Sequence, residues 1–255
     1  MGQPNDWYGI SRSVAVAIVL SLPFLIALRP GNAQAQATVL QLTTEQLPPL
    51  NMSDDNGKTV YGAAADKVHE LMRRSGIGNT MQMMSWNRAI ELARRQADTC
   101  AFATVRTPER EANFKWIGPI AKGDWVLFGP RDKVGKVTNM DQIKGKRIGG
   151  YLGDAAGRYL NDIGYEVVVS YSDEATIKNL LAGRLDYWVS TRKGAQTMIA
   201  QHQAEAQIAE LLHIRSVDYY LACNLQTNDA VINNLRIALK QITSDGTVDR
   251  IDAKY

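Results

Sequence analysis

The stretch Ala97–Arg110, ADTCAFATVRTPER, decides the class of fold. Its first part, Thr99–Val105, is a mostly apolar run typical of a β-strand. Upstream, an apolar spacing of i, i+4, i+7 and i+8 predicts a helix over Ala64–Met72, and Trp86–Ala93 has one apolar face. Strands that alternate with amphipathic helices indicate a parallel sheet covered by helices. One more strand is expected before each helix, at 38–43 and 80–84.

The same alternation returns on the C-terminal side of this stretch. Strands and helices are predicted in turn at 147–150, 155–163, 166–170, 172–181 and 185–190. Two such units in succession indicate two similar α/β lobes. The segments Trp125–Gly129 and Tyr219–Cys223 fit neither unit, and a last helix is predicted over Val231–Ile242. If that helix packs on the first unit, the chain crosses between the lobes twice, and the two crossings form a two-strand hinge.

The first residues have the layout of a secretory signal peptide. A short polar stretch with Arg12 precedes an apolar run from Val14 to Leu28, and small residues follow at 33–37. The run is shorter than the roughly 20 residues that a membrane-spanning helix needs. We therefore expect residues 1–37 to be a cleaved signal peptide and the protein to be periplasmic. An uncleaved membrane anchor is the alternative.

The composition argues against several classes of partner. The formal net charge is +3 and no basic block occurs, which disfavours nucleic acid and anionic membrane surfaces. His69, His202 and His213 are far apart and lack metal-ligand spacing. The sequence has neither a Gly-rich phosphate loop nor a Gly-x-Ser-x-Gly elbow. We expect no metal and no cofactor.

Two cysteines, Cys100 and Cys223, are the whole complement of the chain. In an oxidising compartment an even pair suggests a disulfide. The alternative is two buried thiols that behave as small apolar side chains. The predicted topology brings the two segments near each other, but the sequence leaves both alternatives open.

Several ordered motifs carry a resemblance to a known family. Early in the chain come a Pro-Pro loop at 47–50, an Asn-Gly turn at 56–57 and the start of a helix at 62–66. Thr-Pro-Glu-Arg follows at 107–110, Gly-Arg-Leu-Asp at 183–186 and Ser-Asp-Gly-Thr at 244–247. Together they resemble the amino-acid-type family of extracellular solute-binding proteins (bacterial family 3). The resemblance implies a two-lobed α/β fold of the type II periplasmic-binding-protein class. Two parallel-sheet lobes would be joined by a two-strand hinge, with lobe 1 at 38–128 and 217–255 and lobe 2 at 129–216.

The resemblance also implies where a ligand binds. The arginine of the Thr-Pro-Glu-Arg motif, Arg110, would grip a carboxylate, for which a planar guanidinium is suited. The alternative is a surface arginine paired with Glu109 or Glu111. Trp86 would stack on the ligand, or else serve as helix-face core. The loop with Gly153 and Asp154 would close from lobe 2, where Asp154 either caps a helix or receives a cationic group of the ligand.

Several positions depart from the pattern of the family, among them Leu50, where an aromatic residue often follows the Pro-Pro pair. The family's amino-acid binders usually carry an aspartate five residues after Asp186, where this chain has Thr191. The strand before the arginine motif has Ala103 and Val105 in place of the expected serines. Ala103, Val105 and Thr191 complete the predicted ligand-binding set. These departures disfavour an ordinary α-amino acid and favour a ligand recognised through its carboxylate.

The resemblance finally implies a function. The chain is expected to be a monomeric solute-binding protein, not an enzyme, which delivers a small carboxylate ligand to ABC permease subunits in the inner membrane. A free-standing sensory or scavenging module is one alternative. A periplasmic enzyme similar to cyclohexadienyl dehydratase is the other, and it would need a buried acid such as Asp173 or Glu174. Both lie at a predicted helix N-terminus, which should lower their pKa and disfavour an acid role.

Overall fold

The computed structural model describes Gly9 and residues 39–255. The predicted signal peptide and its cleavage site therefore lie outside the described residues, apart from Gly9. None of the helices in the described part is long and apolar enough to cross a membrane.

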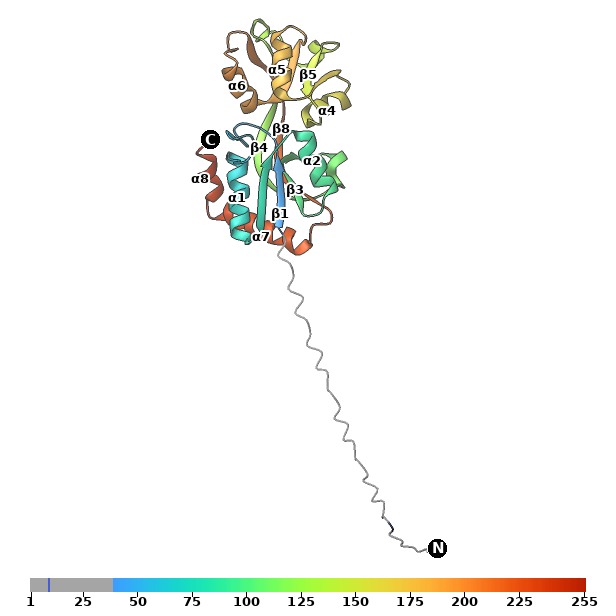
Figure 1. The fold of residues 1–255 in the computed structure, drawn as a ribbon. Helices are drawn as coiled ribbons and strands as arrows, with labels where there is room; N and C mark the ends of the chain where they lie inside the picture. The colour runs from blue at the N-terminus through green and yellow to red at the C-terminus, as the bar shows by residue number, and fades with distance from the viewer. Residues whose placement is uncertain (1–8, 10–38) are drawn as a thin grey trace, which may run out of the picture. The chain divides into compact units, whose positions relative to one another are not determined.

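The first lobe contains the alternation predicted on the N-terminal side (Figure 1). Its elements in chain order are β1 (Val39–Thr44), α1 (Ala63–Ser75), β2 (Gly78–Met83), α2 (Trp86–Arg95) and β3 (Thr99–Val105). β1 pairs in parallel with both β2 and β3. This arrangement places the carboxyl ends of β1 and β3 at one edge of the sheet, where the short helix α3 (Pro108–Glu111) follows β3.

The second lobe repeats this arrangement. Its elements are β5 (Ile148–Tyr151), α4 (Ala155–Asp162), β6 (Val167–Ser170), α5 (Asp173–Leu181), β7 (Tyr187–Thr191) and α6 (Arg192–Gln201). β5 lies between β6 and β7 and is parallel to both. The five predicted elements are confirmed, and α6 was not predicted. Two single-turn 3₁₀ helices precede β5, at Arg131–Lys133 and Met140–Ile143.

Two long strands join the lobes. β4 (Phe114–Pro130) and β8 (Ile208–Asn224) pair antiparallel from Phe114 opposite Asn224 to Pro130 opposite Ile208. The sequence indicates only the apolar parts Trp125–Gly129 of β4 and Tyr219–Cys223 of β8. Polar residues such as Lys122 and Asp218 occupy the stretch of each strand between the lobes. The result is one mixed sheet of eight strands, in the order β2-β1-β3-β8-β4-β7-β5-β6.

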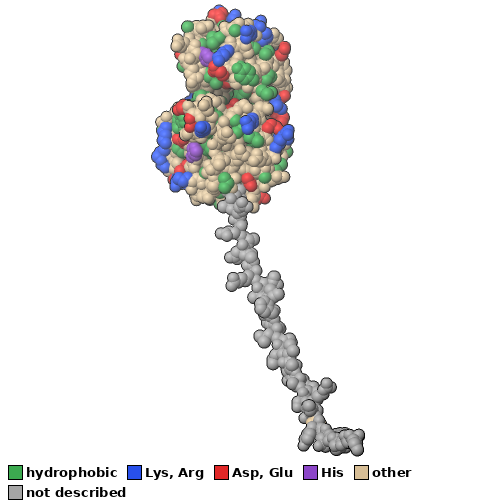
Figure 2. Space-filling model, in the orientation of Figure 1, with side chains coloured by type: hydrophobic (Ala, Val, Ile, Leu, Met, Phe, Trp, Pro, Cys, Tyr) green, Lys and Arg blue, Asp and Glu red, His purple; other side chains and the backbone are tan. Residues whose placement is uncertain are grey.

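Separate apolar cores support the two lobes. In the first lobe, α1 and α7 (Asp229–Ser244) pack on one face of the sheet around Leu42, Leu71 and Leu235. In the second lobe, α4 packs on one face around Leu160, and α5 and α6 pack on the other around Trp188. The last long helix therefore belongs to the first lobe, as the two crossings of the chain require. Figure 2 shows a waist between the two lobes.

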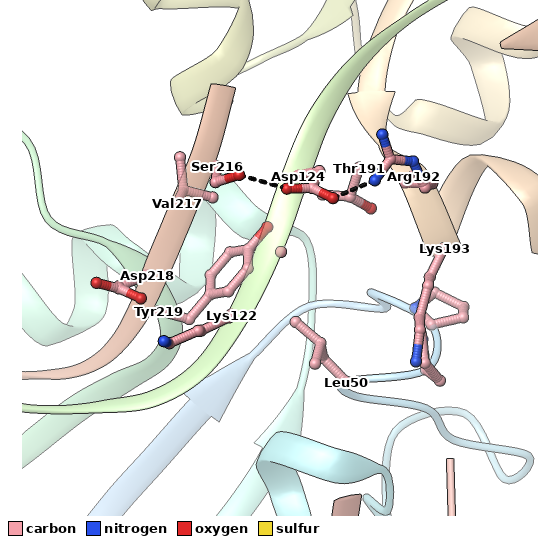
Figure 3. A pocket seen from close by; sticks show the side chains of 13 residues that line it. Leu50, Lys122, Asp124, Thr191, Arg192, Lys193, Ser216, Val217, Asp218 and Tyr219 are labelled. Atoms are coloured by element: carbon pink, nitrogen blue, oxygen red, sulfur yellow. Dashed lines mark hydrogen bonds and ion pairs between the residues drawn. The ribbon is translucent and has the colours of Figure 1, made fainter. Parts of the chain in front are cut away.

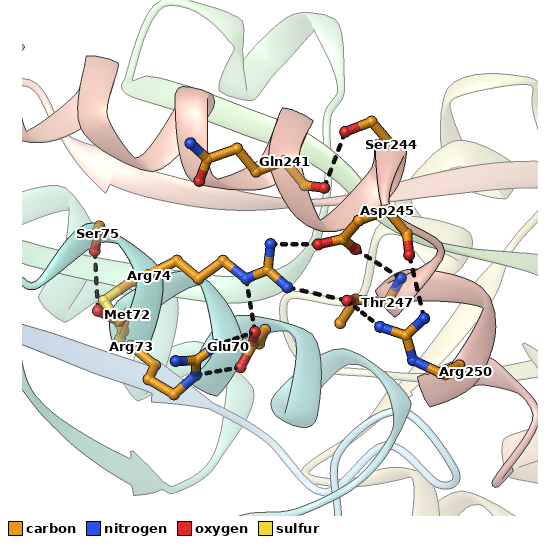
Figure 4. Close-up of polar contacts among 10 residues, drawn as sticks. All are labelled: Glu70, Met72, Arg73, Arg74, Ser75, Gln241, Ser244, Asp245, Thr247 and Arg250. Atoms are coloured by element: carbon orange, nitrogen blue, oxygen red, sulfur yellow. Dashed lines mark hydrogen bonds and ion pairs between the residues drawn. The ribbon is translucent and has the colours of Figure 1, made fainter.

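A polar network fastens the C-terminal elements to the first lobe (Figure 4). Arg74 on α1 bonds Glu70 at 2.7 Å, Asp245 at 2.5 Å and the hydroxyl of Thr247 at 3.1 Å. Thr247 begins α8 (Thr247–Asp252), which also places Asp252 2.6 Å from the buried ammonium of Lys67. These contacts fix α7 and α8 against α1.

Cys100 and Cys223 form a disulfide. They face each other in the antiparallel register of β3 and β8, and both are fully buried in the core of the first lobe. The two cysteines are 123 positions apart in the sequence, and the loop that they close contains the entire second lobe. It therefore joins β3, which precedes the second lobe in the sequence, to the end of β8, where the chain is back in the first lobe.

Candidate functional site

A small cavity lies between the lobes, where the carboxyl ends of the parallel strands meet. Its volume is about 30 Å³, which is room for a water molecule but not for an amino acid. Its wall contains every predicted ligand-binding position except Gly153, whose carbonyl bonds two of the lining side chains. The lining residues are Glu45, Leu47, Trp86, Ala103, Val105, Arg110, Trp125, Tyr151, Asp154, Ala155, Thr191 and Tyr219.

Arg110 enters this cavity from α3. Its guanidinium donates to the carbonyl of Val105 at 3.1 Å and, across the cleft, to the carbonyl of Gly153 at 2.8 Å. Burial lowers the pKa of Arg110, and the nearby carboxylate of Asp154 opposes this shift. Glu111, which could have paired with Arg110 on the surface, pairs instead with Arg106. The guanidinium is half-buried and bonds only neutral carbonyls, although a carboxylate is its stronger hydrogen-bond acceptor.

Trp86 lies at the first turn of α2, beside Arg110. Its indole Nε1 donates to the same carbonyl of Gly153 at 2.9 Å, and the guanidinium carbon of Arg110 is 5.5 Å from its ring centroid. Gly153 has a φ of +80°, and a Cβ atom there would lie 3.2 Å from Trp86. Glycine at this position therefore permits the close approach of the second lobe.

Asp154 acts as the N-cap of α4. Its two carboxylate oxygens accept from the amides of Ala156 at 3.1 Å and Gly157 at 2.9 Å. Burial raises its pKa despite these bonds. The capping interpretation therefore describes what Asp154 does in this structure, and both of its oxygens are engaged.

The remaining predicted positions form neutral walls. Ala103 has a φ of +56° at an irregularity in the pairing of β3 with β8, and Val105 follows it at the end of β3. Thr191 ends β7; its hydroxyl oxygen is buried and finds no hydrogen-bond partner among residues 39–255. None of the three can neutralise a charge on a ligand.

Sequence reasoning missed the polar side chains Glu45, Tyr151 and Tyr219 of the cavity, of which the first two bond each other. Glu45 directly follows β1, and the hydroxyl of Tyr151 donates to it across the cleft at 2.8 Å. Burial raises the pKa of both groups well above their ordinary values. A signal was present, because an acid directly after a buried parallel strand lies at the edge of the sheet where ligands bind.

Asp173 was expected to have a lowered pKa, and this expectation is wrong. Burial raises its pKa to about 7, although Trp188 Nε1 donates to one oxygen at 2.6 Å and Ser190 Oγ to the other at 2.5 Å. Burial thus outweighs the helix N-terminus and both hydrogen bonds. Glu174 instead has a lowered pKa, held by Lys178 and His202 against the effect of burial.

The raised pKa of Asp173 predicts a pH-dependent stability. A carboxyl with an ordinary pKa of 3.8 and a folded value of about 7 favours the folded state at acid pH, and this contribution is lost as the pH rises through 7. Asp173→Asn can accept from Trp188 Nε1 and donate to the hydroxyl of Ser190. It should therefore be more stable than wild type by about 4 kcal/mol at pH 8 and nearly equal at pH 4. Urea unfolding at several pH values measures this difference. The exposed Asp162→Asn is the control, and a pH-independent difference for Asp173→Asn would contradict the assignment.

A second, larger cavity lies beside the hinge strands (Figure 3). Its volume is about 510 Å³, and Thr191 and Tyr219 line both cavities. Arg192 at the start of α6 bonds Asp124 on β4 and lies 2.9 Å from Glu210 on β8. The hydroxyl of Ser216 on β8 donates to Asp124 at 2.7 Å. Arg192 pairs with both carboxylates, so the cluster fastens the second lobe to the hinge strands.

Comparison with known proteins agrees with this architecture. The family model described as "Bacterial extracellular solute-binding proteins, family 3" matches residues 40–255. The putative ABC transporter arginine-binding protein 2 of Escherichia coli (strain K12) is 24% identical over 232 residues, which cover 88% of this chain and 93% of that protein.

Solved structures share the fold. An ancestral arginine-binding protein bound to arginine superposes with a TM-score of 0.75 at 20% identity, covering 86% of this chain and 98% of that one. A histidine kinase sensor domain with similarity to periplasmic binding proteins superposes with a TM-score of 0.78 at 15% identity, covering 85% and 95%. The fold is therefore that of the type II periplasmic binding proteins, with two lobes joined by a two-strand hinge.

Proposed function

The chain belongs to the bacterial extracellular solute-binding proteins, family 3, and from this premise we propose that it captures a small amino-acid-like ligand by its carboxylate, between the two lobes. The observation that carries the proposal is Arg110, whose half-buried guanidinium faces the inter-lobe cavity and bonds only neutral carbonyls. A ligand carboxylate would replace the carbonyl of Gly153. Trp86 would cover the body of the ligand.

Binding requires the lobes to separate first, since the cavity of about 30 Å³ admits no amino acid. In our proposal, residues 38–128 and 217–255 move against residues 129–216 about β4 and β8. Closure on the ligand then selects the form that docks on ABC permease subunits of the inner membrane. The protein would act in the periplasm as a monomer after loss of residues 1–37.

The ligands named for similar proteins suggest an amino acid. Arginine is named for the Escherichia coli relative and for an ancestral arginine-binding protein, and a structure of an ancestral arginine-binding protein holds glutamine. A ligand-binding core from Nostoc punctiforme holds L-glutamate. We propose no catalytic role, since Asp173, the acid whose pKa lies near 7, directs both oxygens at Trp188 and Ser190.

Thermal unfolding against a ligand panel tests this function. The panel contains amino acids, dicarboxylates, amines and small peptides. A ligand at 100 times its dissociation constant stabilises the folded state by about 2.7 kcal/mol, which raises the unfolding midpoint measurably. We expect at least one carboxylate-bearing member to do so and the simple amines to have no effect. A panel with no stabilising carboxylate would contradict the proposal.

A further inference from the structure

The cavity beside the hinge strands adjoins the small cavity at Arg110 (Figure 3). Thr191 at the end of β7 and Tyr219 on β8 line both cavities. Thr191 belongs to the second lobe, whereas Tyr219 pairs with Val105 of β3 in the first. A separation of the lobes that admits a ligand to Arg110 therefore also parts the two side chains that the cavities share. A ligand held between the lobes can then lie in both cavities.

The hinge cavity has the size of a ligand site. Its volume of about 510 Å³ lies within the roughly 300–1,000 Å³ that small-molecule sites occupy, whereas the cavity at Arg110 measures about 30 Å³. Its walls come from both lobes, since residues 48–50 follow β1 and residues 191–193 join β7 to α6. Leu50, Val217 and the two prolines form an apolar part of this wall. Such a surface suits a hydrocarbon chain.

The hydroxyl of Thr191 is an unused hydrogen-bonding group where the two cavities meet. Its oxygen is buried and has no partner within residues 39–255. A Cβ atom at Gly194 would lie 2.5 Å from this oxygen, and one at Gly123 would lie 2.9 Å from the ring of Tyr219. Glycine at these two positions therefore leaves room for both shared side chains. Because a buried polar group without a partner costs free energy, a polar atom of a ligand that crosses here would be bound favourably.

Of the three cations that line the hinge cavity, Lys193 has the weakest partner within the described residues. Arg192 is held by two carboxylates of the hinge strands. Lys122 lies opposite Asp218 in the antiparallel register of β4 and β8. Nζ of Lys193 lies 3.5 Å from the backbone oxygen of Tyr255, and no side-chain carboxylate pairs with it among residues 39–255. An anion in the hinge cavity would therefore find an ammonium group at the start of α6.

We propose that the hinge cavity is a second subsite, which holds the far end of the ligand by a second carboxylate at Lys193. The inference rests on the proposed function, because the first carboxylate of the ligand is placed at Arg110. The chain between the two carboxylates passes Thr191 and Tyr219, and a polar atom in that chain bonds the hydroxyl of Thr191. The ligand class is then an elongated dicarboxylate with a polar group, such as an amide, in its chain.

Isothermal titration calorimetry with two matched pairs of probes tests the second carboxylate. N-succinylglycine and N-butyrylglycine have the same length and the same amide, but only the first carries a second carboxylate. Pimelate and heptanoate differ in the same way and lack the amide. We expect N-succinylglycine to bind roughly tenfold more tightly than N-butyrylglycine. Lys193→Met should remove this preference without weakening N-butyrylglycine, and Lys193→Arg should retain it. The exposed Lys240→Met on α7 is the matched control and should bind like wild type.

Thr191→Val tests the contact where the two cavities meet. The substitution removes the hydroxyl and keeps the volume of the side chain. We expect the affinity for N-succinylglycine to fall roughly fivefold and the affinity for pimelate to stay within a factor of about two. An equal loss for both probes would overturn this contact, because pimelate has no polar atom in its chain.

The outcomes separate the inference from the function. If wild type binds each dicarboxylate no more tightly than its matched monocarboxylate, or if Lys193→Met keeps the preference, the inference fails and the function stands. If wild type binds compact amino acids and none of the four probes, the inference again fails alone. If wild type binds no carboxylate at all, both fail.

Discussion

Arg110→Ala is expected to weaken binding of the carboxylate ligand by roughly 100- to 1,000-fold. Removal of one partner of a buried, hydrogen-bonded charge pair costs about 3–4 kcal/mol, and each 1.4 kcal/mol is a factor of ten in the dissociation constant. The effect should be large because the half-buried guanidinium faces the cavity from the first lobe and bonds only neutral carbonyls there. Titration calorimetry with the tightest ligand of the panel measures it.

Arg106→Ala is the matched control for this prediction. Arg106 lies on the same connection between β3 and α3, but it pairs with Glu111 and stacks near Trp116, outside the inter-lobe cavity. It should leave affinity within a factor of about two, since exposed ion pairs contribute little. Equal affinities of wild type and Arg110→Ala would remove Arg110 from the site.

Loss of the disulfide is expected to lower the free energy of unfolding by about 4 kcal/mol. The bridge joins Cys100 and Cys223, which are 123 positions apart in the sequence, and a loop of that length restricts the unfolded chain strongly in the chain-entropy model. The double variant Cys100→Ala with Cys223→Ala keeps the site apolar, as the buried core around it requires. Urea unfolding at neutral pH measures the difference.

Two further measurements make this prediction decisive. Thiol titration of denatured, unreduced wild type should find no free thiol, since both cysteines are bridged. Wild type treated with a reductant should unfold at the same urea concentration as the double variant. Two free thiols in wild type, or a loss of stability below about 1 kcal/mol in the variant, would contradict the account.

The alternation of apolar strands and amphipathic helices predicted both lobes because each element shows its buried face in its own sequence. Val68 and Leu71, for example, recur at helical spacing and both are fully buried on α1. The long strands β4 and β8 could not be predicted in full. Around Lys122 and Asp218 they lie between the two cores, where polar side chains interrupt the apolar pattern.

The residues of the candidate site likewise fall into those that the sequence predicts and those that only the structure reveals. The motif around Arg110 predicted a residue that the structure brings to the inter-lobe cavity, together with Trp86 and Asp154. Glu45 belongs to no motif, and its partner Tyr151 is 106 residues away in the sequence. Only the closed arrangement of the two lobes reveals their contact. The pKa of Asp173 depends likewise on burial within the second lobe, which the local sequence pattern does not reveal.

A crystal structure with the tightest ligand of the panel tests the central claim most directly. We predict the ligand between the lobes, with its carboxylate within hydrogen-bond distance of the Arg110 guanidinium, in the place that the carbonyl of Gly153 now occupies. A ligand bound in the hinge cavity beside Arg192, with Arg110 still bonded to Gly153, would contradict the account.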